Sequence, residues 1–257
     1  MRVELLPSNI GGPADMQFGM SLLINDDLAI DAGTLGFLWP LERQQKVQHV
    51  LLSHSHVDHT ATLPIFLDNV YEPRPGCPTV YTGLETIECL RRNVFNDSLW
   101  PDFIRLSLEE FPFLTLQQIR SEEVIALPGG TRFIPVLLNH VIPTMGFIVE
   151  DQSAAVAFVS DTGPTDRIWE VLQQQPRLVA VFLECSFPNH LEWLAVKSGH
   201  LCPRLFALEL QKIPTQIPVI AYHLKPAFQR TIAAELAALN RPGLELALSG
   251  RCYEFNA

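Results

Sequence analysis

Six consecutive residues after a short apolar run contain three histidines and one aspartate. The run QHVLLS has the composition of a strand, and the sequence HSHVDH follows it directly. In an extended segment alternate side chains point to the same side, so His54 and His56 can face one ion, while Asp58 and His59 are offset from them. Imidazole nitrogen and carboxylate oxygen are common zinc ligands, whereas packing gives no reason for so dense a cluster. The segment therefore predicts a metal site, and its geometry suits two neighbouring ions.

A site for two ions needs further ligands from elsewhere in the chain. Three polar residues follow strand-like apolar runs, namely His140 in VLLNHVIP, Asp161 in VAFVSDTGP and His223 in VIAYHLKP. Side chains at the C-terminal ends of strands line the clefts of open α/β sheets. Taken singly, each of these residues is more simply explained as a turn or capping residue, so the metal prediction depends first on HSHVDH.

Apolar periodicity predicts strands and helices in two batches, with no internal repeat. Short strands joined by turns, one of them at GGPAD, are expected from RVELL to LAIDAG, and helices are expected over 63–71 and 83–95. Further strands are predicted at TRFIPVLL, MGFIVED, AAVAFVSD and LVAVFLEC. This order predicts two sheets face to face with helices outside, in one domain over 1–257. The segment 93–116 breaks the pattern and is expected to be an inserted lid or a closely packed connection.

Composition narrows the functional class. A hydrophobic fraction of 47% supports a sizeable core, and a net charge of −10 leaves no general basic surface for a long nucleic acid. The five scattered cysteines form no CxxC spacing, which argues against a disulfide framework and a thiolate zinc site. Since the sequence contains no signal-peptide pattern and no apolar stretch of about 18 residues, a cytoplasmic protein is expected. The oligomeric state stays open, with a homodimer among the alternatives.

The sequence HSHVDH has the HxHxDH form of the metallo-β-lactamase superfamily, which the chain resembles from Asp31 in AIDAG to His223. This resemblance implies an α/β fold, a four-layer αβ/βα sandwich. It also implies two divalent ions, with Zn²⁺ expected and Mn²⁺ or Fe²⁺ as alternatives. The resemblance assigns the ligands to one ion on His54, His56 and His140, a second on Asp58, His59 and His223, and Asp161 bridging both.

Further motifs favour phosphodiester chemistry within this superfamily. The chain lacks the PGHT-like segment of thiolester hydrolases, and Asp161 occupies the position where zinc β-lactamases often have a cysteine. NHVIPTMGFIVED is similar to the ribonuclease Z branch. The stretches VFNDSLWPDF, SDTGPTDRIWE, FLECSFPN, GHLCPRLFALEL and YHLKP resemble class II cyclic-nucleotide phosphodiesterases. These resemblances imply that the substrate is a small molecule, cyclic AMP or cyclic GMP, which is hydrolysed to the nucleoside 5′-monophosphate.

Glu184 in LECSF and His200 in SGHL are similar to an acid pair of the ribonuclease Z branch. Because Glu184 follows the apolar run VAVFL, burial of its carboxylate requires a partner. The resemblance implies that His200, kept protonated by Glu184, donates a proton to the leaving 3′ oxygen, while Asp58 orients the water that two ions activate. The alternative is an exposed histidine after a glycine and a surface acid at a strand end.

Three weaker candidates concern substrate contacts. Trp100 and Phe103 are candidates for stacking on a purine, with packing inside the segment 93–116 as the alternative. Lys225 is a candidate for a phosphate contact or else a solvated side chain.

Two rival functions stay open. One is a ribonuclease Z-like tRNA 3′-processing endonuclease, which the acidic balance and the lack of a glycine-rich basic arm disfavour. The other is a non-catalytic metal-binding sensor module, which an intact ligand set together with Glu184 and His200 disfavours.

Overall fold

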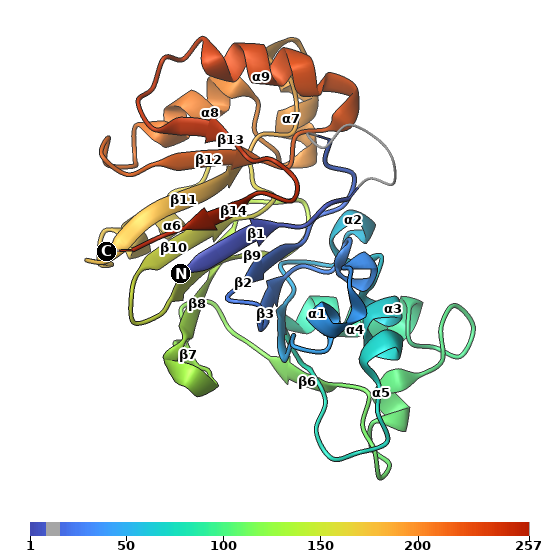
Figure 1. The fold of residues 1–257 in the computed structure, drawn as a ribbon. Helices are drawn as coiled ribbons and strands as arrows, with labels where there is room; N and C mark the ends of the chain where they lie inside the picture. Colours follow the sequence, from blue (N-terminus) through green and yellow to red (C-terminus); the bar gives the residue numbers. More distant parts are fainter. Residues whose placement is uncertain (9–15, 257) are drawn as a thin grey trace.

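The computed structural model describes residues 1–8 and 16–256, so the turn predicted at GGPAD lies outside the described residues. The described residues form two seven-stranded sheets that face each other, with helices on both outer sides (Figure 1). The predicted four-layer α/β sandwich is therefore confirmed. No helix in this described part of the chain is both long and apolar enough to cross a membrane.

The first sheet joins the two ends of the chain and holds the strand that precedes HSHVDH. Its neighbours are antiparallel from β14 to β3 and parallel from β3 to β6. In spatial order its strands are β14 (Cys252–Glu254), β1 (Arg2–Leu5), β2 (Leu22–Ile24), β3 (Leu28–Ile30), β4 (His49–Leu51), β5 (Thr79–Thr82) and β6 (Thr115–Gln118).

The second sheet supplies the remaining strands that end at the site. Strands β10 to β13 run parallel, and β9 is antiparallel to both of its neighbours, so β8 runs in the same direction as β10. In spatial order its strands are β13 (Leu244–Leu246), β12 (Val219–Tyr222), β11 (Leu178–Glu184), β10 (Ala155–Val159), β9 (Thr144–Glu150), β8 (Arg132–Leu138) and β7 (Ile125–Ala126).

The helices lie on the outer faces of the two sheets. Helices α1 (Leu41–Gln44), α3 (Leu63–Val70), α4 (Leu84–Asn93) and α5 (Phe103–Leu106) lie on the side of the first sheet, and α2 (Val57–Thr60) carries part of HSHVDH (Figure 1). On the side of the second sheet lie α6 (Arg167–Leu172), α7 (Glu192–Ser198), α8 (Pro203–Leu210) and α9 (Gln229–Ala237).

Strand β10 shows how one sequence serves two cores. Its side chains alternate: Val156 and Phe158 pack between the sheets, whereas Ala157 and Val159 pack under the helices of the second sheet. Because both faces are covered, every residue of β10 is buried, and the strand reads as a continuous apolar run rather than an alternating one. The apolar layer between the sheets is shared by both.

The sequence missed several elements and left two alternatives open for one segment. Strand β5 and helix α7 were not predicted. In the segment 93–116, Phe95, Phe103 and Leu114 are buried in the apolar cluster under α3 and α4, so the closely packed connection describes it better than a lid.

Candidate metal centre

The predicted ligands come from four separate segments that meet where strands of both sheets end. HSHVDH follows β4, with His56 at the N-cap of α2 and Asp58 and His59 inside that helix. His140 lies just after β8, Asp161 just after β10, and His223 directly after β12. The parallel direction of β8, β10 and β12 brings their C-terminal ends to one edge of the sheet, which explains the convergence.

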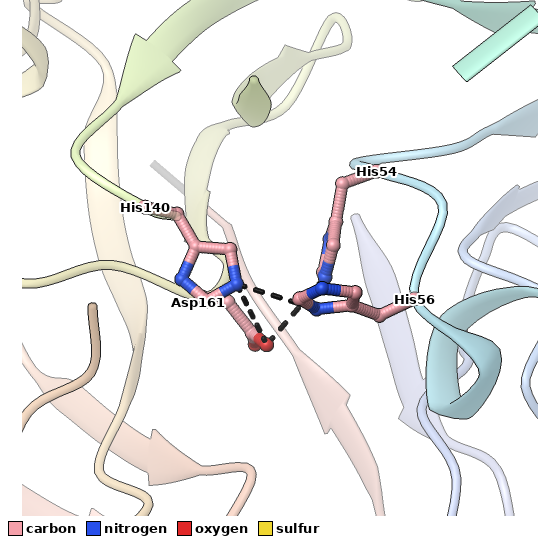
Figure 2. A group of neighbouring side chains, drawn as sticks. All are labelled: His54, His56, His140 and Asp161. Carbon is pink, nitrogen blue, oxygen red and sulfur yellow. Dashed lines mark hydrogen bonds and ion pairs between the residues drawn. The ribbon is translucent and has the colours of Figure 1, made fainter. Parts of the chain in front are cut away.

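His54, His56, His140 and Asp161 form the first group, in which one ligand atom from each lies within 4.8 Å of the others. Nε2 of His140 is 3.3 Å from Nδ1 of His56, and Oδ2 of Asp161 is 3.6 Å from Nε2 of His54. Figure 2 shows the imidazoles and the carboxylate pointing toward one another from three loops.

Asp58, His59 and His223 form the second group, within the same 4.8 Å limit. Nε2 of His59 lies 3.2 Å from Nε2 of His223, which in turn lies 3.4 Å from Oδ2 of Asp58. The side chain of Asp161 lies between the two groups. Its Oδ2 faces His54, while its Oδ1 lies 3.3 Å from Nε2 of His59 and 3.5 Å from Nε2 of His223.

Hydrogen bonds at the far side of four of the rings fix which nitrogen faces the cluster. Nδ1 of His59 donates to Oδ2 of Asp31 at 2.7 Å, and Nδ1 of His140 donates to the carbonyl of Gly199 at 2.7 Å. The Nδ1 atoms of His54 and His223 lie 2.9 and 2.8 Å from the hydroxyls of Ser53 and Ser186. The nitrogen that these four rings aim at the cluster is therefore Nε2, which has a free lone pair in the neutral imidazole, as metal ligation requires. His56 faces the cluster with Nδ1 instead.

Three of these supporting residues were missed as functional residues by sequence reasoning. Asp31 is a polar residue directly after β3, which is the same signal that singled out Asp161 and His223. Ser53 and Ser186 carried no comparable signal, because a serine at a strand end is common and its partner comes from elsewhere in the chain.

The donor set fits divalent cations. Two ligands of a tetrahedral zinc at about 2.0–2.1 Å lie roughly 3.3 Å apart, close to the separations within each group. The buried Nε2 of His54 and Oδ1 of Asp161 have no hydrogen-bond partner within the described residues. Facing Nε2 lone pairs on His59 and His223 repel unless a proton or cation lies between them. The cluster is thus capable of holding metal ions.

Charge within the cluster also favours a cation. Burial lowers the pKa of His54 well below its ordinary value, which keeps this ring neutral. Burial alone raises the pKa of Asp161, but the charges of His223 and His59 outweigh it and hold the carboxyl well below its usual range. Burial lowers the pKa of His59, yet Asp161 and Asp31 raise it well above its ordinary value. A ring between two carboxylates binds a positive charge strongly, whether a proton or a metal ion.

Glu184 and His200 form a buried pair beside this cluster. Glu184 ends β11 with a fully buried side chain, and its Oε1 accepts hydrogen bonds from Nδ1 of His200 at 2.8 Å and from the backbone N–H of Thr162 at 3.1 Å. Nε2 of His200 lies 3.9 Å from Oδ2 of Asp161. Although burial lowers the pKa of His200, the charge and hydrogen bond of Glu184 raise it above its ordinary value. The partner expected for a buried Glu184 is therefore present.

The three candidates for substrate contacts fall in different places. Nζ of Lys225 lies 3.2 Å from Oδ2 of Asp58, at the edge of the cluster. Phe103 is only 3% exposed and stacks on Phe113 with ring centroids 4.0 Å apart, and Trp100 packs against the same apolar cluster. Packing already occupies the ring of Phe103, so the packing alternative fits this residue, and it fits Trp100 as well.

Comparison with known proteins places this architecture among known folds. The profile of the "Beta-lactamase superfamily domain" matches residues 29–221. A relative from Yersinia pestis named "Probable 3',5'-cyclic-nucleotide phosphodiesterase" is 26% identical over 91% of this chain and 74% of its own length. The crystal structure of unliganded yeast PDE1 is similar with a TM-score of 0.78 and 20% identity over 98% of each chain. Human tRNase Z, short form, is similar with a TM-score of 0.70 and 15% identity over 100% of each chain.

Proposed function

This chain belongs to the beta-lactamase superfamily, and from its site we propose that it is a metal-dependent phosphodiesterase that hydrolyses 3′,5′-cyclic nucleotides to nucleoside 5′-monophosphates. The observation that carries the proposal is the buried pair of Glu184 and His200, whose free imidazole nitrogen lies 3.9 Å from Asp161. A proton donor beside a metal cluster suits a reaction whose leaving group is a poorly stabilised alkoxide. The name of the relative from Yersinia pestis supports the same substrate class.

The proposal includes two divalent ions, with Zn²⁺ expected first and Mn²⁺ or Fe²⁺ as alternatives because the same donors accept all three. Bound in pairs, such ions lower the pKa of water and stabilise the attacking and leaving oxygens of a displacement at phosphorus. The proposed ligands are His54, His56 and His140 for one ion, Asp58, His59 and His223 for the other, and Asp161 for both.

Asp58 and Lys225 have complementary parts in the proposed reaction. Burial raises the pKa of Asp58, but the hydrogen bond from His223 and the charges of His59, His223 and Lys225 lower it far more, so the carboxylate stays ionised. An ionised carboxylate accepts a hydrogen bond from the attacking water and orients it. The ammonium group of Lys225, 3.2 Å from Asp58, is proposed to bind a phosphate oxygen.

His200 is proposed as the general acid. Water attacks phosphorus, the bond from phosphorus to the 3′ oxygen breaks, and the proton on Nε2 of His200 passes to that oxygen. One proton of the water stays on the new P–OH group, and the other leaves to solvent, from which His200 is protonated again. The Glu184 carboxylate holds Nδ1 of His200 at 2.8 Å and stabilises the protonated ring before the transfer. Proton donation of this kind typically contributes roughly 10²–10⁴ in rate.

The two rival functions explain fewer of the observations than cyclic-nucleotide hydrolysis does. The likeness to human tRNase Z is 15% in sequence, and the net charge of −10 gives no general attraction for tRNA. A non-catalytic sensor has no need of the acid pair. A cytoplasmic location and a homodimer stay predictions from the sequence.

The deciding experiment incubates the purified protein, with and without chelator, with cyclic AMP, cyclic GMP and a tRNA precursor. Chromatography of the products should show a nucleoside 5′-monophosphate that disappears when chelator is added. Cleavage of the tRNA precursor alone would overturn the proposal in favour of the endonuclease, and no chemistry on any substrate would favour the sensor.

A further inference from the structure

A hollow of about 640 Å³ opens beside the metal cluster at Asp58. Phe18, Phe37 and Val57 line it, and these apolar side chains are 57%, 59% and 74% exposed. Large exposed apolar side chains around a concave surface commonly mark a binding site. The volume lies within the roughly 300–1,000 Å³ typical of small-molecule sites.

We propose that this hollow binds the nucleobase of the substrate, with the rings of Phe18 and Phe37 as its stacking surfaces. The inference rests on the proposed function, because it assigns a place to the part of a cyclic nucleotide that the metal cluster does not contact. Stacking on an aromatic ring suits any base, since every base has a π face. Phe103, by contrast, is buried in an apolar cluster and stacked on Phe113.

The hollow and the cluster are connected through shared residues. A second, smaller cavity of about 30 Å³ has Asp58, His223, Lys225 and Phe18 among its lining residues. Asp58 and Phe18 line both spaces. Because the two spaces share these residues, the hollow adjoins the cavity at Lys225. The charged groups of the cluster and the aromatic rings of the neighbouring hollow match the charged phosphate and the aromatic base of a cyclic nucleotide.

Backbone hydrogen bonds hold the walls of the hollow in a fixed position relative to Asp58. The N–H of Met20 donates to the carbonyl of Asp58 at 2.8 Å, and the N–H of Gly33 donates to the carbonyl of Met20 at 2.8 Å. The N–H of Phe18 donates to the hydroxyl of Ser8 at 2.8 Å. Preorganised walls reduce the entropy cost of binding, which favours a dedicated site over a chance surface depression.

The test compares two substrates that differ only in the base. One is cyclic AMP, and the other is the 3′,5′-cyclic phosphate of 1-O-methylribose, which keeps the sugar and the phosphodiester. Phe18→Ala and Phe37→Ala should each raise KM for cyclic AMP by about tenfold, since loss of one stacking contact weakens binding by roughly 5- to 150-fold. The same variants should leave kinetics on the base-free substrate within about twofold of wild type. Inhibition by AMP should weaken in parallel, while inhibition by ribose 5-phosphate should not.

Control variants separate the possible failures. Phe37→Tyr keeps an aromatic face and should retain the wild-type KM. Leu108→Ala removes an apolar side chain that is 87% exposed and does not line the hollow, so it should retain the wild-type KM as well. Equal KM increases on both substrates, or none on either, would overturn the base site while cyclic-nucleotide hydrolysis by the wild type upholds the proposed function. If the wild type hydrolyses no cyclic nucleotide, the proposed function fails first, and the base site fails with it.

Discussion

Oδ2 of Asp31 lies 2.7 Å from Nδ1 of His59, and both side chains are buried. The same carboxylate accepts hydrogen bonds from the backbone N–H and the hydroxyl of Ser53, at 2.8 and 2.9 Å. One residue after β3 thus fixes the orientation of an imidazole in HSHVDH and of the backbone that precedes it. Carboxylates that hold the far nitrogen of a ligating histidine fix its ring and raise its basicity.

Asp31→Asn should therefore weaken metal binding without touching a proposed ligand. The amide keeps the shape of the side chain but removes the negative charge that strengthens Nε2 of His59 as a donor. The expected loss in affinity is about 10–100-fold, measured by competition with a chromophoric chelator. Asp68→Asn, at an exposed position of α3, is the matched control and should bind as wild type. Unchanged affinity in Asp31→Asn would show that the contact with His59 is only structural.

Removal of metal should lower the melting temperature of the wild type. The carboxylate of Asp161 and the facing imidazole lone pairs of His59 and His223 then lack a cation between them.

Asp161→Ala deletes the carboxylate whose two oxygens face the two groups, so this variant should bind less metal and lose turnover. Differential scanning calorimetry with and without chelator, together with elemental analysis, measures both effects. A full complement of metal and wild-type activity in Asp161→Ala would be incompatible with its bridging role.

The sequence identifies the ligands in HSHVDH more directly than the residues that support them from elsewhere in the chain. HSHVDH places four candidate ligands by chain connectivity alone, so His54, His56, Asp58 and His59 need no knowledge of the fold. Asp31 is different, because its importance depends on the pairing of β3 with β4, which brings it against Ser53. A strand pairing is a tertiary fact that no spacing in the chain records.

Aromatic residues show a second limit of prediction from sequence, the choice between a packing role and a binding role. Phe103 and Phe18 both stand in polar, proline-containing surroundings, yet one is buried in a stack and the other is 57% exposed beside the cluster. Composition around a phenylalanine does not decide between packing and binding. The position of the neighbouring segments does, and for Phe18 that position is held by hydrogen bonds from Phe18 to Ser8 and from Met20 to Asp58.

His200→Ala should separate substrates by their leaving groups. A ribose 3′ alkoxide needs a proton as it departs, so hydrolysis of cyclic AMP should fall by roughly 10²–10⁴. An ester with a p-nitrophenolate leaving group needs no such help and should be hydrolysed at close to the wild-type rate. Metal content measured alongside excludes loss of ligands as the cause. Equal losses on both substrates would remove the general-acid role.

Glu184→Gln should shift the pH dependence of cyclic-nucleotide hydrolysis. The wild-type carboxylate raises the pKa of His200, and the acid acts only while protonated, so activity falls as pH rises through that pKa. Loss of the charge lowers this pKa, and the alkaline limb of kcat should move to lower pH. The profile for the p-nitrophenyl ester should not move. An unchanged alkaline limb would mean that another group titrates there.

Gly33→Ala should damage both stability and the cluster, because the chain passes Asp58 too closely for a side chain. A Cβ at this position would lie 1.9 Å from the carbonyl oxygen of Asp58 and 2.5 Å from the nitrogen of Met20, and neither backbone atom can rotate away. We expect a loss of about 3 kcal/mol, or roughly 6–12 °C in melting temperature, together with weaker metal binding. Gly83→Ala is the control, since its new Cβ would meet only side-chain atoms at 3.6 and 3.8 Å. Equal melting temperatures for the two variants would show that the backbone around Asp58 yields easily, and that its position is not held by this close approach.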